Sequence, residues 1–367
     1  VHRLLGLKRL PDVTTVSRTL AGLDDASVTH LRQLVRQRVL DQLGGLVLAR
    51  LTLDFDGSVL STVRFAVGMA VGFNLMKKVQ RSYYPLFFTI AETGQVLDVW
   101  DRPGNVLVSF CARAFILACV REIKAIMPRC VIEARMDSAF FSDDIVRMLD
   151  AEGVEFTISV PFERFVALKA LIENRRRWCC LNGQWSFFET NWKPASWDER
   201  YRFVFIRSQN RKQYKGAVQL DLFIPYEYGY DFKVIVTNKQ TSAKKALAFH
   251  NGRGAQEGVF AELKSQTQMD YVPTRTKACN QTFLLSAVLA HNLNREMQML
   301  CYEKERNTTE KRAPLWCFEQ LGTVRRKLIQ RAGRLTRPQG QLTLTMSANP
   351  AVKSELLHYL DALKSAA

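Results

Sequence analysis

The sequence lacks any apolar stretch long enough to cross a membrane, and it lacks the side-chain spacing of a zinc site. Its longest apolar stretches, such as Phe65–Phe73, are far shorter than the about 18 to 20 residues that a membrane-spanning helix needs. Its 8 cysteines include no Cys-x-x-Cys pair, and its 5 histidines supply no zinc-type spacing. The N-terminus shows no signal-peptide pattern. We therefore expect a cytoplasmic protein with no membrane partner.

Acidic residues are outnumbered by basic ones, with 35 Asp and Glu against 52 Lys and Arg, which gives a net charge of +17. Lys and Arg gain most from a polyanion whose condensed counterions they release on binding, so nucleic acid is the expected partner. A basic surface that only keeps the protein in solution is the alternative. The segment 321–340 has no acidic residue, and we expect its Arg325, Arg326 and Arg331 to contact phosphates, although a solvated basic helix has the same pattern.

The hydrophobic fraction of 47% is ample for a core, and the length fits about two or three structural units. Residues 1–46 are expected to be helical, with helices at Val13–Leu23, capped by Asp12, and at Ser27–Leu43. Two short helices of this kind either dock on DNA or pack on the main domain. We take residues 1–46 as a helical DNA-binding region.

Residues 47–160 combine turn-bounded strands with helical patterns. Antiparallel strands followed by strand–helix–strand units are typical of a mixed α/β sheet with helices on its faces. The expected strands are Leu46–Phe55, Arg64–Phe73, Tyr84–Ile90, Val96–Trp100, Cys130–Met136 and Glu155–Val160, and the expected helices are Val106–Met127 and Ser142–Glu152.

The composition changes between residues 161 and 240, where four of the 6 tryptophans lie (Trp178, Trp185, Trp192 and Trp197). We expect a mostly β insertion, whose tryptophans either stack on unpaired bases or pack in a core. Helical patterns at Arg253–Gln266 and Thr282–Cys301 predict that residues 241–300 return to the first domain. Residues 301–367 form a basic C-terminal region.

Three carboxylate positions stand at the ends of predicted elements. On the strand that ends at 53–58, side chains alternate, so Asp54 and Asp56 share one face and can present oxygen ligands to a divalent cation. An acidic turn that closes a hairpin is the other interpretation. Asp137 ends the next such strand and either belongs to the same site or caps the following helix, a role that Ser142 could also fill.

The third position lies in the helix predicted over 253–266. At about 100° per residue, Arg253, Glu257 and Lys264 fall within about 40° of one another, with His250 nearby if the helix extends that far. Glu262 lies about 140° from Glu257 and is expected to be solvated. This face is either part of a site or a surface row of salt bridges.

Two strand-end aspartates and one helix-borne glutamate are what two-metal phosphoryl transfer requires, because three carboxylates can hold two Mg²⁺ ions about 4 Å apart. Over about residues 47–300 the sequence resembles the group-1 DDE transposases of bacterial insertion sequences. The resemblance rests on His-x₂-Arg-x₃-Glu-x₆-Lys at 250–264, which is similar to the family's Tyr-Arg-Glu-Lys signature, on Asp-Gly-Ser at 56–58, on Arg-x-Asp-Ser-x-Phe at 135–140, and on the segments 82–86, 102–105, 237–238 and 291–293.

The resemblance implies a catalytic, metal-binding triad of Asp56, Asp137 and Glu257 with two Mg²⁺ ions, for which Mn²⁺ can substitute. It also implies a ribonuclease-H-like core interrupted by the β insertion, and phosphate contacts from Arg253 and Lys264. His250 stands where the signature has tyrosine and could still donate a hydrogen bond to phosphate.

The activity implied by the resemblance is that of a nucleoid-associated transposase. It would bind the terminal inverted repeats of double-stranded DNA as a homodimer, cleave each end and join the 3′-hydroxyls to target DNA. Three matters stay open at this point. Asp54 rivals Asp56 as the first carboxylate, a ribonuclease-H-like nuclease without strand transfer has the same motifs, and so has a non-catalytic DNA-binding derivative.

Overall fold

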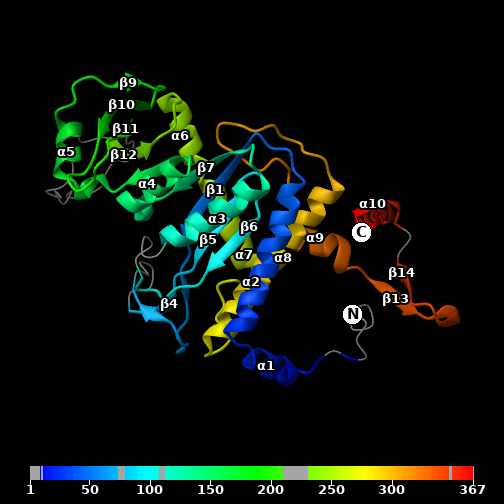
Figure 1. Cartoon of the computed structure of the whole chain (residues 1–367). Coiled ribbons are helices and arrows are strands. Elements are labelled where there is room, and N and C mark those ends of the chain that lie inside the picture. The colour runs from blue at the N-terminus through cyan, green and yellow to red at the C-terminus, as the bar shows by residue number, and fades with distance from the viewer. Residues whose placement is uncertain are drawn as a thin grey trace, which may run out of the picture.

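A large mixed sheet forms the centre of the protein (Figure 1). The computed structural model describes residues 9, 11–72, 79–106, 112–209, 230–346 and 349–366. The strands, in their order across the sheet, are β6 (Val96–Trp100), β5 (Leu86–Ile90), β1 (Arg50–Gly57), β7 (Val131–Met136), β8 (Glu155–Val160), β12 (Tyr230–Thr237), β11 (Tyr201–Gln209), β10 (Trp185–Trp192) and β9 (Cys179–Cys180).

The first five strands of that order have the ribonuclease-H-like arrangement that we predicted. Strands β1, β7 and β8 are parallel neighbours, and β5 and β6 continue the sheet antiparallel on the other side of β1. The strands of the predicted insertion extend the same sheet, because β12 pairs antiparallel with β8 and is followed by β11, β10 and β9. Part of that segment, residues 210–229, lies outside the described residues.

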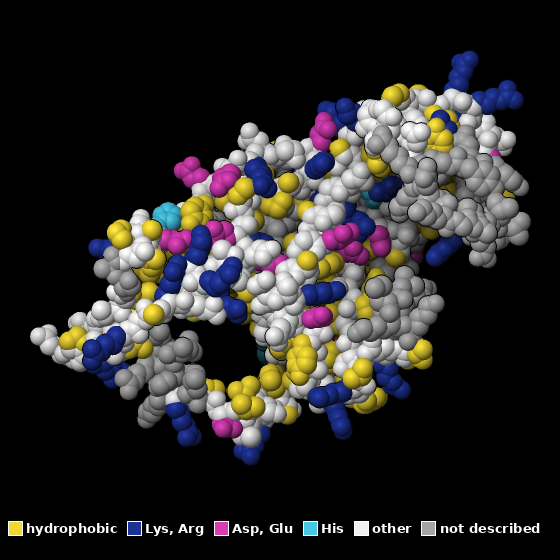
Figure 2. All heavy atoms as spheres, turned by 180° about the vertical axis from the view of Figure 1, so that it is seen from behind, with side chains coloured by type: hydrophobic (Ala, Val, Ile, Leu, Met, Phe, Trp, Pro, Cys, Tyr) yellow, Lys and Arg dark blue, Asp and Glu magenta, His cyan; other side chains and the backbone are white. Residues whose placement is uncertain are grey.

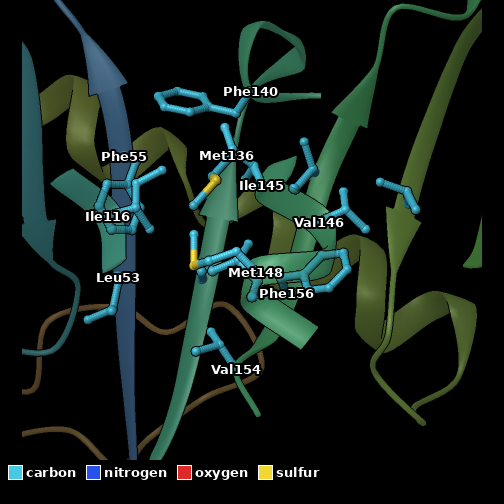
Figure 3. Close-up of a cluster of buried hydrophobic side chains, with 14 of the residues drawn as sticks. Leu53, Phe55, Ile116, Met136, Phe140, Ile145, Val146, Met148, Val154 and Phe156 are labelled. Carbon is cyan, nitrogen blue, oxygen red and sulfur yellow. The ribbon is translucent and has the colours of Figure 1, made fainter. Parts of the chain in front are cut away.

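One face of the sheet is apolar and packs against α3 (Ala112–Ile126) and α4 (Asp143–Ala151). Leu53 and Phe55 of β1 point into this core, as strand alternation predicts, and Figure 3 shows them beside Ile116 of α3. Ser142 caps α4 through its hydroxyl. The residues that alternate with Leu53 and Phe55, among them Asp54 and Asp56, therefore face the opposite side of the sheet.

The opposite side is covered by three helices, α6 (Ala243–Asn251), α7 (Gly254–Thr267) and α8 (Lys277–Cys301). Phe260 and Leu263 of α7 join a second core with residues of α8, β5 and β6. After α8 the chain returns to the sheet, where the Leu315 backbone N–H donates to the Glu92 carbonyl at 2.8 Å. We call residues 303–320 the strap, because this segment crosses the polar face of the sheet.

The N-terminal helices are α1 (Val13–Ala21), capped by Asp12, and α2 (Asp25–Gly44). Helix α2 packs against α8 and β6 and buries Val35, Val39 and Leu43, whereas α1 buries none of its residues. Residues 1–8 and 10 lie outside the described part of the chain. DNA docking by this region remains a prediction. It applies better to α1, which is exposed, than to α2, which packs on the main domain.

The strand predicted at Arg64–Phe73 is wrong over most of its length. Only Ala70–Val71 form a short strand, β3, which pairs with β4 (Arg81–Tyr83), itself paired with β2 (Leu60–Ser61). The apolar residues Ala66 and Met69 instead bury against the second core from a loop, whose Val67 N–H donates to Arg275 O at 2.8 Å. Phe73 and residues 107–111, where the predicted helix from Val106 begins, lie outside the described residues.

The tryptophans of the 161–240 segment that we can place contribute to packing. Trp197 is buried and stacks on Phe141, and Trp192 packs edge-on against Phe203. This segment also contains η2 (Phe162–Arg164) and α5 (Val166–Glu173). Core packing is therefore the better of the two interpretations for Trp192 and Trp197.

The C-terminal region projects from the body of the molecule and then returns to it (Figure 1). It comprises α9 (Leu321–Val324), the π-helical turn η3 (Arg325–Ile329), the hairpin β13 (Gly333–Thr336) and β14 (Thr343–Met346) with η4 (Pro338–Gly340) between them, and α10 (Pro350–Ala366). Helix α10 packs on α8.

Among the described residues, no helix has the length and apolar character that a membrane span requires.

Candidate active site

Asp56 and Asp137 lie side by side at the carboxyl ends of β1 and β7. The two strands are parallel with Phe55 opposite Met136, so the residues that follow these partners are also neighbours. Burial and the charge of Asp137 raise the pKa of Asp56 to about 6. Burial also raises the pKa of Asp137. The fold therefore holds two carboxylates together in surroundings that disfavour their charges.

Arg253 is the cation of this site. Its Nη1 lies 2.6 Å from Oδ2 of Asp56, and its charge lowers the pKa of both aspartates against the stronger effect of burial. The other oxygen of Asp56 accepts from the Gly57 N–H at 2.8 Å, and Oδ1 of Asp137 accepts from the Ala139 N–H at 3.0 Å. Each carboxylate thus has one oxygen fixed by backbone.

Helix α7 is attached to β1 at its first turn. Nε2 of the buried Gln256 donates to the Asp54 carbonyl at 3.1 Å, next to the contact between Arg253 and Asp56. Arg253 itself has helical backbone angles, so Glu257, four residues on, lies one turn away on the same face of the helix. The attachment places this face of α7 at the ends of β1 and β7.

Glu257 is exposed and does not meet the two aspartates. Among the described residues, no group of three His, Cys, Asp or Glu side chains is placed to hold a metal ion together. The structure therefore brings together two of the three predicted carboxylates, with the third one helical turn from Arg253. Lys264 lies in the last turn of α7, about 16 Å from Arg253 along the helix axis, and is half-buried.

Asp54 occupies the same strand face as Asp56 but has a different environment. Both of its oxygens are bound by the fully buried Arg135, with Nε at 2.6 Å from Oδ1 and Nη2 at 2.7 Å from Oδ2. Arg135 also donates to the carbonyls of Phe249 and Lys311 at 3.0 and 2.7 Å. Asp54 is thus committed to an ion pair that joins β1, β7, α6 and the strap.

His250 has no ring nitrogen to offer to a phosphate in this structure. Its ring is buried, with Nε2 at 2.8 Å from Oγ of Ser159 and Nδ1 at 3.0 Å from Oγ1 of Thr157. Burial, together with the charges of Lys233 and Arg253, holds its pKa well below the usual value. Helix α6 ends before Arg253, so the helix of Arg253 does not extend to residue 250, which was the condition for His250 to lie near that helix face.

Our prediction that Glu262 is solvated is wrong. The side chain is buried, pairs with Arg295 of α8 and accepts from the Leu321 N–H at 2.8 Å. The helical projection correctly places Glu262 away from Glu257, but the side of α7 that it occupies is covered by α8 and α9. Glu262 is a structural carboxylate of the second core.

Tyr84 is also a neighbour of Asp56 and Asp137, although the sequence motifs assigned it no role. Burial and the charges of Asp56 and Asp137 raise its pKa to about 12, so its hydroxyl keeps its proton at neutral pH. A Cβ at Gly57 would lie 2.6 Å from Cζ of the Tyr84 ring, so only glycine fits there. The guanidinium of Arg102 lies 5.9 Å from the Tyr84 ring centre. The motif segments 82–86 and 102–105 were the sequence signals for this contact.

The basic residues Arg325, Arg326 and Arg331 are exposed on η3 and just after it. They are therefore accessible to a polyanion, and their contact with phosphates stays a prediction. On the face shown in Figure 2, Lys and Arg side chains are spread over the whole surface, whereas acidic side chains gather at a few places.

The comparisons with known proteins agree with these motifs. Residues 5–367 match the family described as transposase DDE domain, group 1. No curated protein matches the sequence. The chain is similar to the piggyBac transposase in a synaptic complex with hairpin DNA, at 11% identity and a TM-score of 0.39, over 82% of this chain and 57% of that one. It is also similar to the Mos1 transposase in a paired-end complex with the left transposon end, at 10% identity and a TM-score of 0.21, over 42% and 48%.

The chain thus spans about half the length of each of these two solved transposases. The family match covers nearly every residue, including the strand ends that carry Asp56 and Asp137 and the helix that carries Arg253. This chain belongs to the group-1 DDE transposases.

Proposed function

We propose that this chain cleaves the ends of a mobile DNA element and joins the resulting 3′-hydroxyls to target DNA. The observation that carries the proposal is the pairing of Asp56 with Asp137 at adjacent strand ends, with Arg253 beside them. Repulsion between two neighbouring carboxylates raises the free energy of the folded protein. Such an arrangement is typical of functional sites, where a bound ligand removes the repulsion.

A divalent cation fits that description. Carboxylate oxygens are the preferred ligands of Mg²⁺, and the repulsion that helps to raise the pKa of Asp56 is what bound cations would remove. Asp56, Asp137 and Glu257 would hold two Mg²⁺ ions, with Mn²⁺ as a substitute. When bound, the ions would activate the attacking hydroxyl and stabilise the negative charge on the leaving oxygen.

The residues of the chain then have separate tasks. Arg253 neutralises Asp56 in this structure and, with DNA present, would transfer its guanidinium to the scissile phosphate, which it can bind through several N–H donors. Gln256 keeps α7 on β1 during this exchange. Glu257, one turn from Arg253, would complete the carboxylate set when its exposed side chain turns toward the strand ends.

The remaining contacts would be made along the double-stranded DNA. The exposed Arg325, Arg326 and Arg331 and the half-buried Lys264 would bind phosphates outside the catalytic centre. Two DNA ends must be processed together, so we propose a homodimer in the DNA complex.

The test is an assay with a plasmid that carries both ends of the element, in Mg²⁺. We expect cut ends and joined products with the wild type, and loss of both in Asp137→Asn and Glu257→Gln, with DNA binding retained. Asp270→Asn, at an exposed carboxylate after α7, is the matched control. Cut ends without joined products would favour the nuclease, and full activity of Glu257→Gln would remove that residue from the site.

A further inference from the structure

Lys233 lies at the same edge of the sheet as Asp56 and Asp137. It stands in the middle of β12, directly before Val234, which pairs with Val160 at the end of β8. Since β8 is parallel to β7 and β1, this part of β12 lies at the sheet edge where the carboxyl ends of the three strands are found. Neighbouring strands lie about 4.8 Å apart, so β12 is about 10 Å from β7 across the sheet.

The surroundings of Lys233 combine burial with a second cation. The side chain is half-buried, and its Nζ donates to Oδ1 of Asn251, the last residue of α6, at 3.0 Å. Burial, and next the charge of Arg253, lower the pKa of Lys233 to about 8. Within the described ranges no carboxylate lies at ion-pair distance from Lys233, in contrast to Arg253, which has Asp56.

A purely structural role does not require this charge. An uncharged donor could bond Asn251 equally well, and it would avoid both the loss of hydration and the repulsion from Arg253. An ammonium group has three donors, and Asn251 takes one of them. An anion placed between Lys233 and Arg253 would satisfy the others and would cancel the repulsion.

We propose that Lys233 and Asn251 form, together with Arg253, a phosphate-binding subsite for the DNA backbone next to the scissile phosphate. The inference rests on the proposed function, because it takes DNA as the anion. An offset of about 10 Å from β7 corresponds to a phosphate within about three nucleotides of the cleaved bond, at about 3.4 Å of axial rise per nucleotide. Lys233 would therefore hold the strand in register while Arg253 acts at the reacting phosphate.

The first experiment compares Lys233→Gln with Lys244→Gln, a change at an exposed lysine on the neighbouring helix α6. Binding of a fluorescent DNA duplex of arbitrary sequence is measured over a series of salt concentrations. Loss of one phosphate contact lowers the slope of log affinity against log salt by about 0.9. We expect this change for Lys233→Gln, near wild-type values for Lys244→Gln, and recovery of the slope in Lys233→Arg.

The second experiment uses the unaltered protein, so it does not depend on the folding of a variant. Amine acetylation of Lys233 and Lys244 is followed by mass spectrometry with and without the same duplex. We expect DNA to suppress acetylation of Lys233 several-fold more than that of Lys244.

The outcomes separate the two proposals. A wild type that binds the duplex while Lys233→Gln keeps its full salt slope, or equal protection of both lysines, overturns the subsite and leaves the proposed function standing. A wild type that fails to bind DNA overturns both.

Discussion

Two parts of one polar sheet face, carried by the same strands, have opposite electrostatics. Near the start of β1 and β7, Glu133 is fully buried and paired with Arg50, Lys239 and Arg312 at 2.8, 2.6 and 2.6 Å. We call these four residues, with the Asp54–Arg135 pair beside them, the closed network. At the ends of the same strands lie Asp56 and Asp137, the open pair.

Three cations stabilise the charge of Glu133 in the closed network, whereas the charges of the open pair are disfavoured. Burial alone would raise the pKa of Glu133, but its bonds to Arg312 and Lys239 lower it to about 2. In the open pair the balance is reversed, because burial and mutual repulsion outweigh Arg253. Glu133 is thus a carboxylate whose charge stabilises the fold, whereas the fold stabilises the charge of Asp56 poorly. Burial raises the pKa of Asp54 as well, so Asp54 differs from Asp56 in having both of its oxygens bound by Arg135. The difference indicates which of them is available to a ligand.

The largest effect should come from exchanging the two aspartates of β1 for asparagine, one at a time. Asp56→Asn should lower DNA cleavage by about 10⁴-fold, or about 5 kcal/mol of activation free energy, with little loss of stability. Asp54→Asn should instead leave Arg135 buried without its counter-charge and cost about 3–5 kcal/mol of unfolding free energy. Cleavage rates and urea unfolding of both variants check this, and a reversed pattern would make Asp54 the first catalytic carboxylate.

Within the closed network, Glu133→Gln should lower the unfolding free energy by about 3–5 kcal/mol, because three cations lose their shared buried carboxylate. Glu155→Gln is the matched control, since Glu155 pairs with Arg50 and Lys239 but is 33% exposed. It should cost about 1 kcal/mol or less. Equal losses of unfolding free energy in the two variants would mean that a buried ion pair at Glu133 contributes no more to stability than the exposed one at Glu155.

The open pair should make the protein less stable as the pH rises. The pKa of Asp56 is raised from 3.8 to about 6, so the folded state holds a proton that the unfolded state has released. That contribution is present in full below about pH 4 and is lost between about pH 4 and pH 6, a fall of about 1–3 kcal/mol.

Asp56→Asn should remove the part of the fall that Asp56 contributes, while Glu92 and Asp101, whose pKa values burial raises to about 7, act equally in both proteins. The difference between the wild-type and variant profiles of thermal unfolding from pH 4 to 7 tests it. Added Mg²⁺ should stabilise the wild type above pH 6 and have little effect near pH 4.5. A difference between wild type and variant that does not change from pH 4 to pH 7 would mean that Asp56 does not hold this proton.

The smallest effects should come from the exposed basic residues. Arg326→Gln should weaken DNA binding only a few-fold and lower the salt slope by about 0.9, without changing stability, because its guanidinium is solvated. Salt-dependent binding isotherms measure it. A loss of DNA binding as large as the loss of cleavage in Asp56→Asn would mean that η3 takes part in the catalytic centre.

The sequence was sufficient to predict a mixed sheet with helices on its faces, and the family resemblance implied that Asp56 and Asp137 share one site. The strand order became visible only in the structure. The sequence could not separate Asp54 from Asp56, since the separation depends on Arg135, which reaches Asp54 from the neighbouring strand. The motif Arg-x-Asp at 135–137 contains Arg135, but the side of the sheet to which Arg135 points, and hence its pairing with Asp54, is determined by the packed sheet.

The errors arose where tertiary contacts override a local pattern. His250 and Glu262 were placed by helical projection, and neither the end of α6 before Arg253 nor the cover of α8 and α9 over Glu262 is visible in a projection. Lys233 was missed because it reaches the site through the pairing of β12 with β8, residues 155–160 with residues 230–237, which are far apart in the sequence. Glu257 was predicted to join the aspartates, and its place in the metal site remains a prediction.

The most direct test of the central claim, that Asp56 and Asp137 form the metal-binding centre, is oxidative cutting of the polypeptide by Fe²⁺ bound in place of Mg²⁺. Hydroxyl radicals formed at the ion cut the backbone close by, and mass spectrometry locates the cuts without any knowledge of the DNA ends. We expect cuts beside Asp56, beside Asp137 and in the first turn of α7, all lost in Asp137→Asn. Cuts confined to other segments, or cuts at these positions that persist in Asp137→Asn, would contradict it.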